Sequence, residues 1–478
     1  MQKLKLTIVL AILIFYIGSQ EKLRHAKAFP SSPSFFSAKN TNSSELPDFW
    51  PDKEAIADTS SLNIEWFPEE DTNRTFPLKQ RHLYYNSQPN VRIHGFYIRP
   101  ANLPAATIPG MILLHGGGSN YQAMIPLAYY LAETLGFGSL CLDAPGNNYT
   151  SSDGWGSTGP MDTPEFRGNV TGLDGPRGAS IYYNVIAALR SITLLQSLPE
   201  INPSLVGLGG FSLGGITTLI TNGVESKYER LKFVVDFAAP GNWNQEFFET
   251  SIWGYYYDLE WGTEKCEIFL EAFDPINYAP FAYAPTLMVC GTNDETFPLM
   301  LFKQTFEKLP EPKALSLLAG QGHLVYREAQ SLESMLSWCQ VIVEEETPYA
   351  VPSFDRVDHH SNGTMTIDVY LANEPRIDEV GLIYNFANLD SPTAWLTEKK
   401  ALQEGKAIYS WTIETQNAEE YAFYPAVFRN GLQIFSGPPV FHNDLQKLSE
   451  SKSSKLTALE LIIAILLINY AAKKKTRQ

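Results

Sequence analysis

Short apolar runs alternate with amphipathic stretches through the middle of the chain. The apolar runs have the length of buried strands, and the stretches between them have the length and periodicity of helices. This alternation predicts an α/β fold with a mostly parallel sheet and helices on both faces. The predicted strands are 111–114, 138–142, 205–209, 233–237, 286–290 and 314–318, and the predicted helices are 123–135, 179–198 and 329–343.

A different pattern precedes this region. Aromatic and β-branched runs at 64–67, 82–85 and 91–98 are separated by turn residues. Such runs predict an antiparallel meander that leads into the sheet. The α/β domain is therefore expected to cover residues 61–346.

The composition changes again after the last predicted helix. Pro348 and Pro352 mark a linker, and short strands with turns about every ten residues follow. One of these turns is Asn430-Gly431, a strong hairpin signal. This pattern predicts a small β-sandwich of immunoglobulin or fibronectin type over residues 347–445.

An aromatic-rich block at 239–284 interrupts the α/β pattern. It holds three tryptophans together with several phenylalanines and tyrosines. Its position favours a cap-like insert over the sheet edge, and an extra layer of core is an equal alternative. The polar, glycine-rich segment 147–176 is expected to be a long loop that borders a site.

Both ends of the chain carry membrane signals. Residues 1–28 combine lysines with an apolar stretch, which predicts a signal peptide or a signal anchor, and 29–60 is expected to be a linker or arm. A second linker, 446–455, precedes the apolar segment 456–472, which is predicted to be a transmembrane helix with a basic cytoplasmic tail at 473–478. The expected protein is thus anchored in a membrane, with its catalytic domain outside the cytoplasm.

Composition narrows the partners. The chain of 478 residues has a net charge of −16, which argues against a nucleic-acid partner. Sequons compatible with export and glycosylation begin at Asn42, Asn73, Asn148, Asn169 and Asn362. Of the four cysteines, Cys141 and Cys290 lie in apolar runs typical of buried free thiols, and disulfides remain an alternative.

The candidate chemistry centres on Ser212. It lies in Gly210-Phe211-Ser212-Leu213-Gly214, between a predicted strand and a predicted helix. A Gly-x-Ser-x-Gly run in that setting is typical of a nucleophile elbow, where a sharp turn exposes the serine oxygen. A glycine-rich turn without catalytic function is the alternative for this pattern alone.

A nucleophilic serine needs a base and an acid, which should follow it in the order acid, then histidine. Asp294 comes directly after the predicted strand 286–290, and His323 follows the last strand of the sheet. Asp236 is the second choice for the acid, and Asp274, before a proline, is expected to be a turn or helix cap. The other histidines after the serine, His359, His360 and His442, fall in the linker or the β domain.

Backbone amides are expected to bind the oxyanion. One should belong to Leu213, and others to Gly117 and Gly118 in the run His115-Gly116-Gly117-Gly118, where glycines allow close approach to a substrate. A plain tight turn is the alternative for this run, and His115 is expected to be structural. No metal or organic cofactor is implied.

With these motifs the chain resembles the α/β-hydrolase superfamily, in its dienelactone-hydrolase, acetylxylan-esterase and prolyl-oligopeptidase branches. The order of cap, Asp274-Pro275, strand and acid, followed by a β domain, is also similar to the PhoPQ-activated pathogenicity-related proteins. The superfamily resemblance implies Ser212 as nucleophile, Asp294 as acid and His323 as base. It implies a serine carboxylesterase acting on a small-molecule ester or an acylated carbohydrate. The alternatives are a peptidase of prolyl-oligopeptidase type and a non-catalytic surface binding protein on a hydrolase scaffold.

Overall fold

The computed structural model describes residues 45–444. Within that range it leaves out 73, 105–106, 148–152, 161–163, 252, 347–348, 373, 416–417, 419 and 443. The predicted export segment 1–28 and the predicted spanning segment 456–472 therefore lie outside the described residues. Within the described part of the chain, no helix is both long enough and apolar enough to cross a membrane.

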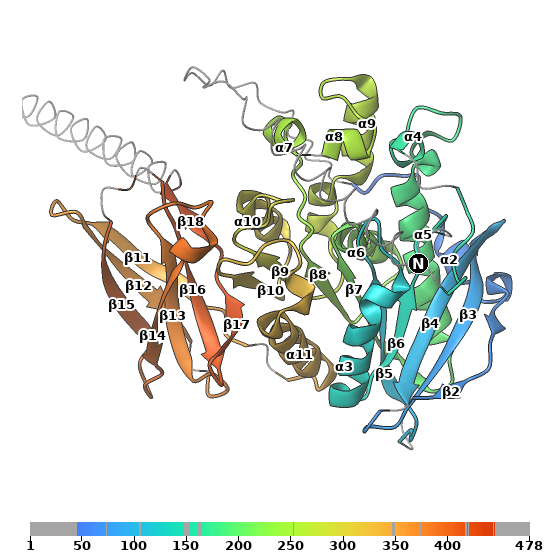
Figure 1. Ribbon diagram of the computed structural model, residues 1–478, viewed down its shortest axis with the longest axis horizontal. Coiled ribbons are helices and arrows are strands. Elements are labelled where there is room, and N and C mark those ends of the chain that lie inside the picture. The colour runs from blue at the N-terminus through green and yellow to red at the C-terminus, as the bar shows by residue number, and fades with distance from the viewer. Residues whose placement is uncertain are drawn as a thin grey trace, which may run out of the picture. The chain divides into compact units, whose positions relative to one another are not determined.

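One large sheet runs through the structure (Figure 1). Its order is β1-β3-β4-β6-β5-β7-β8-β9-β10-β17-β16-β13-β14, with β2 and β18 attached to β3 and β16. The six neighbouring strands β6, β5, β7, β8, β9 and β10 are parallel to one another. Strands β1, β3 and β4 form an antiparallel meander beside them. The predicted meander and parallel sheet are both present. The bounds are β1 (Glu65–Trp66), β2 (Glu70–Asp71), β3 (Leu78–Gln88), β4 (Val91–Pro100), β5 (Ile108–Leu114), β6 (Gly138–Leu142), β7 (Ile201–Phe211), β8 (Phe233–Phe237), β9 (Thr286–Gly291) and β10 (Lys313–Leu318).

Alternate residues of β5 show how the sheet is covered on both faces. Met111 and Leu113 belong to one buried apolar cluster, and Ile112 and Leu114 belong to a second. Since successive side chains of a strand point to opposite faces, both faces are covered at β5 by different clusters. At β9 the first cluster covers both faces, because Leu287, Met288 and Val289 all belong to it. Helices α3, α6 and α11 contribute side chains to the first cluster, and α5 contributes side chains to both clusters. Their bounds are α3 (Ile125–Leu135), α5 (Ser180–Gln196), α6 (Leu213–Val224), α10 (Leu299–Lys308) and α11 (Ala329–Val343).

The second half of the predicted arm differs from the expectation. Trp50 and Ile56 are 4% and 2% exposed, so residues 45–60 pack onto the α/β domain. The Trp50 indole stacks on Tyr182 at 5.4 Å between ring centroids and donates to the Tyr278 hydroxyl at 3.3 Å. Here α2 (Lys53–Ala57) follows Asp52. The composition did not reveal this anchoring because it rests on a few apolar side chains, such as Trp50 and Ile56, and on hydrogen bonds to backbone carbonyls.

The aromatic-rich block 239–284 forms short helices, which Figure 1 shows gathered at one end of the sheet. They are α7 (Gln245–Thr250), α8 (Trp253–Tyr256) and α9 (Glu264–Phe273). Most of the aromatic side chains are buried against one another, including Trp243, Phe247 and Trp253. The block therefore has features of both predicted alternatives: its helices form an insert, and its side chains add a layer to the core. The predicted loop 147–176, earlier in the chain, contains α4 (Pro164–Arg167).

The C-terminal strands fall into two sheets. A three-stranded antiparallel sheet has the order β11-β12-β15, and the others continue the large sheet. The junction is the antiparallel pair β10–β17, in which Leu315 faces Ser436. The bounds are β11 (Ser353–His359), β12 (Thr364–Tyr370), β13 (Glu379–Asn385), β14 (Leu396–Ala401), β15 (Ile408–Glu414), β16 (Ala422–Arg429), β17 (Leu432–Ser436) and β18 (Val440–Phe441).

Candidate active site

Ser212 stands at a sharp turn between β7 and α6. Its backbone has φ 54° and ψ −116°, a strained conformation for a residue with a side chain. The turn is tight enough that a Cβ on Gly210 would lie 2.2 Å from the carbonyl oxygen of Gly214. A Cβ on Gly214 would lie 2.3 Å from the carbonyl oxygen of Leu114. Both glycines of the motif are therefore required by close backbone contacts, and the geometry is that of the predicted elbow.

His323 lies between Ser212 and Asp294. Its Nε2 is 2.9 Å from Ser212 Oγ, and its Nδ1 is 2.8 Å and 3.0 Å from the two carboxylate oxygens of Asp294. The Asp294 side chain is fully buried and His323 is 12% exposed. A buried carboxylate on Nδ1 orients the imidazole so that Nε2 faces the serine hydroxyl. The structure thus brings together the three side chains that the sequence analysis selected.

The acid and the base are both held by hydrogen bonds with residues of the acid loop. The carboxylate oxygen Oδ1 of Asp294 accepts hydrogen bonds from the amides of Thr296 and Phe297 at 2.8 and 2.9 Å. The His323 amide donates to Glu295 Oε2 at 3.0 Å. Glu295 therefore joins the base loop to the acid loop, a role that its position next to Asp294 did not disclose.

The other candidates from the sequence lie elsewhere. Asp236 is buried in β8, where burial raises the pKa of its carboxyl well above the usual range and the nearby Asp294 charge adds to the shift. Asp274 accepts from the amides of Ile276, Asn242 and Trp243 at 2.7 to 3.0 Å, so it caps the turn at Pro275 and holds the beginning of the aromatic block. Burial raises the pKa of Asp274 to about 6, against the opposing effect of these amides.

The remaining histidines do not reach the serine. In the C-terminal region, His359 Nε2 is 3.2 Å from the Tyr421 hydroxyl and His360 Nε2 is 2.8 Å from Thr366 Oγ1. The His442 ring packs on Tyr421 at 4.8 Å between centroids. All four cysteines are buried free thiols. Among the described residues, no group of His, Cys, Asp and Glu is arranged to hold a metal ion.

The glycine loop after β5 lies against the elbow. A Cβ on Gly116 would be 3.3 Å from Ser212 Cβ, and one on Gly117 would be 3.9 Å from Leu213 Cβ. Leu213 begins α6, and the first amides of a helix have no carbonyl partner within the helix. The positive end of the helix dipole, at the N-terminus of α6, also favours negative charge there. The predicted oxyanion residues Gly117 and Leu213 are therefore neighbours beside the serine.

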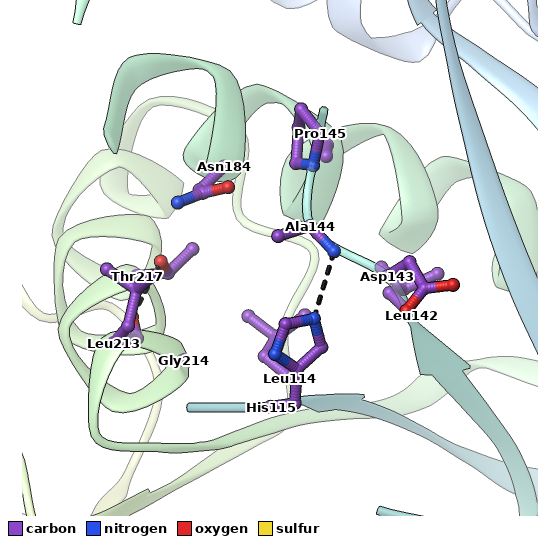
Figure 2. A pocket seen from close by; sticks show the side chains of 11 residues that line it. Leu114, His115, Leu142, Asp143, Ala144, Pro145, Asn184, Leu213, Gly214 and Thr217 are labelled. Atoms are coloured by element: carbon purple, nitrogen blue, oxygen red, sulfur yellow. Dashed lines mark hydrogen bonds between the residues drawn. The ribbon is translucent and has the colours of Figure 1, made fainter. Parts of the chain in front are cut away.

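His115 ties the glycine loop to the loop after β6. Its Nε2 accepts from the Ala144 amide at 3.1 Å, and its Nδ1 is 2.8 Å from the Gly116 carbonyl oxygen. Figure 2 shows the ring beside a small cavity between these loops, which residues of α5 and α6 also line. With about 20 Å³, the cavity has room for a single water molecule rather than a substrate. His115 is thus placed to fix the loop, as expected for a structural residue.

A chain of side chains, Asp143, His94 and His82, is bonded to the segment that follows the glycine loop; Asp143 and His94 are buried and His82 is half-buried. Asp143 Oδ2 is 2.7 Å from His94 Nδ1, and His94 Nε2 is 2.9 Å from His82 Nδ1. Asp143 Oδ1 accepts from the Tyr121 amide at 2.9 Å, while the His82 ring stacks on Trp155 at 4.0 Å. Burial, together with the neighbouring His94, lowers the pKa of His82 to about 4. The sequence analysis missed this chain because its members lie on three separate elements.

The C-terminal region also contacts the site loops. Asn293 Nδ2, next to the acid, donates to the Leu389 carbonyl at 2.9 Å. A Cβ on Gly320, in the base loop, would lie 2.3 Å from the Pro392 carbonyl oxygen. The loop between β13 and β14 therefore packs directly against the loops that carry Asp294 and His323.

Two solved acetyl xylan esterase structures are similar to this chain, and the first of them supports the fold. An acetyl xylan esterase from Paenibacillus sp. R4 is 20% identical with a TM-score of 0.50, covering 61% of this chain and 92% of its own. Acetyl xylan esterase 1 from Thermoanaerobacterium sp. JW/SL YS485 is 20% identical with a TM-score of 0.45, covering 59% of this chain and 88% of its own. No curated protein matches the sequence significantly.

The family comparison covers most of the chain. The family model described as acetyl xylan esterase matches residues 34–341, which is the α/β-hydrolase region with the elbow, the glycine loop and the base loop. The fold, the site and this match together show a serine hydrolase of the carboxylesterase type. The chain belongs to the acetyl xylan esterase family.

Proposed function

We propose that the protein hydrolyses carboxylic esters through an acyl-enzyme, with Ser212 as nucleophile, His323 as general base and Asp294 as the orienting acid. The observation that carries this proposal is the pair of contacts made by His323. Its Nε2 is 2.9 Å from Ser212 Oγ while its Nδ1 is 2.8 Å from the buried Asp294 carboxylate. These distances lie within the range for proton transfer between a serine and its base.

The reaction would proceed in two halves. His323 Nε2 accepts the hydroxyl proton as Ser212 Oγ bonds to the carbonyl carbon, and the carbonyl oxygen becomes an oxyanion. The imidazolium then gives its proton to the alkoxide leaving group as the ester C–O bond breaks. A water molecule repeats the sequence on the acyl-enzyme and releases the carboxylic acid. Asp294 stabilises the imidazolium in both halves.

The amides of Leu213 and of the loop that holds Gly117 and Gly118 would donate to the oxyanion. Amides that are already oriented stabilise developing charge without reorganisation when the reaction occurs. The dipole at the beginning of α6 acts in the same direction.

We further assign acetylated carbohydrates as the substrate class. The matched family and the two similar structures are named for acetyl xylan esterase activity. A net charge of −16 disfavours anionic polymers, whereas acetylated neutral sugars are uncharged.

The test is ester turnover by the purified protein and its Ser212→Ala variant. Activity would be measured on acetylated xylo-oligosaccharides, aryl acetates, longer acyl esters and a peptide amide. The variant is expected to lose about 10⁴-fold or more in kcat, as removal of a triad serine does elsewhere. Ser204→Ala is the matched control, because Ser204 is an exposed serine on the same strand that bonds only to Asn202 among the described residues.

The outcomes distinguish the three functional hypotheses, which are an esterase, a peptidase and a non-catalytic binding protein. Loss of acetyl ester turnover in Ser212→Ala alone supports the esterase. Amide cleavage in preference to ester cleavage would replace it with a peptidase. A protein that neither turns over esters nor reacts with a fluorophosphonate probe at Ser212 would be a binding protein on a hydrolase scaffold.

We also retain two proposals about organisation. Residues 1–28 would direct export and 456–472 would anchor the protein in a membrane, with the catalytic domain outside the cytoplasm. Residues 347–445 would form a β-sandwich. Protease accessibility in intact cells, with alkaline extraction of the membrane fraction, tests the anchoring. Release of the protein by alkali would contradict it.

A further inference from the structure

The hydroxyl of Tyr256 lies over the glycine loop. Tyr256 ends α8, in the aromatic-rich block, far in sequence from the elbow. A Cβ on Gly117 would be 2.8 Å from the Tyr256 hydroxyl oxygen and 3.9 Å from Leu213 Cβ. One small volume is therefore bordered by Gly117 and Leu213, two of the three predicted oxyanion residues, and by a phenolic O–H from the insert.

From this juxtaposition we infer that Tyr256 is a catalytic residue whose hydroxyl donates a third hydrogen bond to the oxyanion. The inference rests on the proposed function, since an oxyanion forms only if Ser212 attacks a carbonyl. It goes further because it assigns part of the reaction to the insert, which neither the elbow nor the glycine loop supplies. The absence of a side chain at Gly117 leaves the hydroxyl room to approach that loop.

The surroundings of the ring favour donation to an anion. The Arg167 guanidinium lies over one face of the Tyr256 ring, 3.8 Å from its centroid, and Arg167 Nη1 donates to the Tyr256 carbonyl at 3.3 Å. A cation on the ring draws electron density from the phenol, so the O–H becomes a better donor. Arg167 acts through Tyr256 and is therefore a positioning residue.

The insert also holds the ring in place. Trp253 stacks on Tyr256 at 5.7 Å with 14° between the ring planes, and it packs on Phe297 at 5.0 Å. Phe297 in turn contacts the His323 ring at 5.7 Å. This row of aromatic rings connects the hydroxyl to the general base, so the donor and the base share one rigid support. Donors fixed before the reaction are the ones that stabilise a transition state.

The test compares Tyr256→Phe with the unmodified protein on p-nitrophenyl acetate and on an alkyl acetate. The substitution removes one oxygen and keeps the ring. Loss of a donor to the oxyanion should lower kcat about 10- to 100-fold and leave KM within about threefold, because the bond strengthens only in the transition state. The second-order rate of fluorophosphonate labelling at Ser212 should fall by a similar factor, since the tetrahedral adduct places an oxygen in the same position.

Two further variants make the test specific. Tyr257→Phe removes the hydroxyl of the neighbouring residue, Tyr257, whose fully buried ring packs on Phe269. This variant should keep kcat within about twofold. Arg167→Met should lower kcat about three- to tenfold on its own and have no further effect in the Tyr256→Phe background, because its effect passes through the phenol. Thermal unfolding of each variant checks that the fold is intact.

Each outcome decides one point. If Tyr256→Phe keeps full kcat, or changes KM alone, while Ser212→Ala is inactive, the inference is wrong and the proposed esterase stands. If Arg167→Met still lowers kcat in the Tyr256→Phe background, the polarising role of Arg167 is wrong. If the unmodified protein neither turns over esters nor reacts with the probe, both the inference and the proposed function are wrong.

Discussion

Replacing Asp236 by asparagine should change how stability depends on pH. The Asp236 carboxyl is fully buried, and burial, with the Asp294 charge second, raises its pKa well above the usual range. In the native state the group therefore keeps its proton. In the unfolded chain it loses the proton above a pH of about 4. As pH rises from there, native Asp236 binds more protons than the unfolded state, so its contribution to stability falls.

The size of the effect follows from linkage. While the native pKa stays above the assay pH, each pH unit costs about 1.4 kcal/mol, which is the largest slope that a single titrating group can produce. The asparagine side chain of the variant cannot ionise and has no such cost. The free energy of unfolding of Asp236→Asn, relative to the unmodified protein, should thus rise as the pH increases above about 4, by at most about 1.4 kcal/mol per pH unit.

Urea unfolding followed by tryptophan fluorescence at pH 5, 6 and 7 measures this difference. Equal pH slopes for the two proteins would refute the reasoning, because they would place an ionised carboxylate in the interior. Ester turnover provides the second readout. Asp236→Asn should remain active, whereas Asp294→Asn should lose about 10⁴-fold in kcat. Inactivity of Asp236→Asn with an intact fold would return Asp236 to the position of catalytic acid.

Two other substitutions test the supports around the site. Gly320→Ala should lower both stability and kcat, because its Cβ would lie 2.3 Å from the Pro392 carbonyl oxygen. Thermal unfolding and ester kinetics measure the two effects. Gly405→Ala is the control for backbone strain, since Gly405 also has a positive φ but no neighbour within 4 Å of its Cβ position. His82→Gln should remove a loss of stability on acidification. The pKa of native His82 is lowered to about 4, so this side chain stays neutral while the unfolded chain binds a proton below about pH 6.5, and the unmodified protein loses about 1.4 kcal/mol per pH unit down to pH 4. An unchanged pH slope of the unfolding free energy in the variant would contradict this.

The sequence predicted the central strands well because they are buried on both faces, and the last helix because its apolar positions recur with helical periodicity. The strand 233–237 and the helix 329–343 have the same bounds in the structure. Uniformly apolar runs bounded by turn residues leave little freedom in where a strand begins and ends. The order of Ser212, Asp294 and His323 at strand ends was equally informative, because parallel strands bring their carboxyl ends to one edge.

The surroundings of the site could not be predicted in the same way. Tyr256 stands in a run of aromatic residues of which most form core, and nothing in the sequence distinguishes the one that lies over Gly117. Glu295 joins the base loop to the acid loop through a contact 28 residues along the chain. Such roles depend on tertiary geometry, which hydrophobic periodicity does not encode.

The junction between β10 and β17 has a consequence for biosynthesis. Ser436 Oγ donates to the Leu315 carbonyl, a partner 121 residues earlier in the chain. At about 5–20 residues per second, a ribosome needs roughly 6–24 s to produce the second partner after the first. During that interval the nascent hydrolase sheet has an uncovered edge at β10, and unpaired strand edges recruit other chains. The nascent protein thus passes through a window in which premature termination or slow translation after residue 318 favours aggregation.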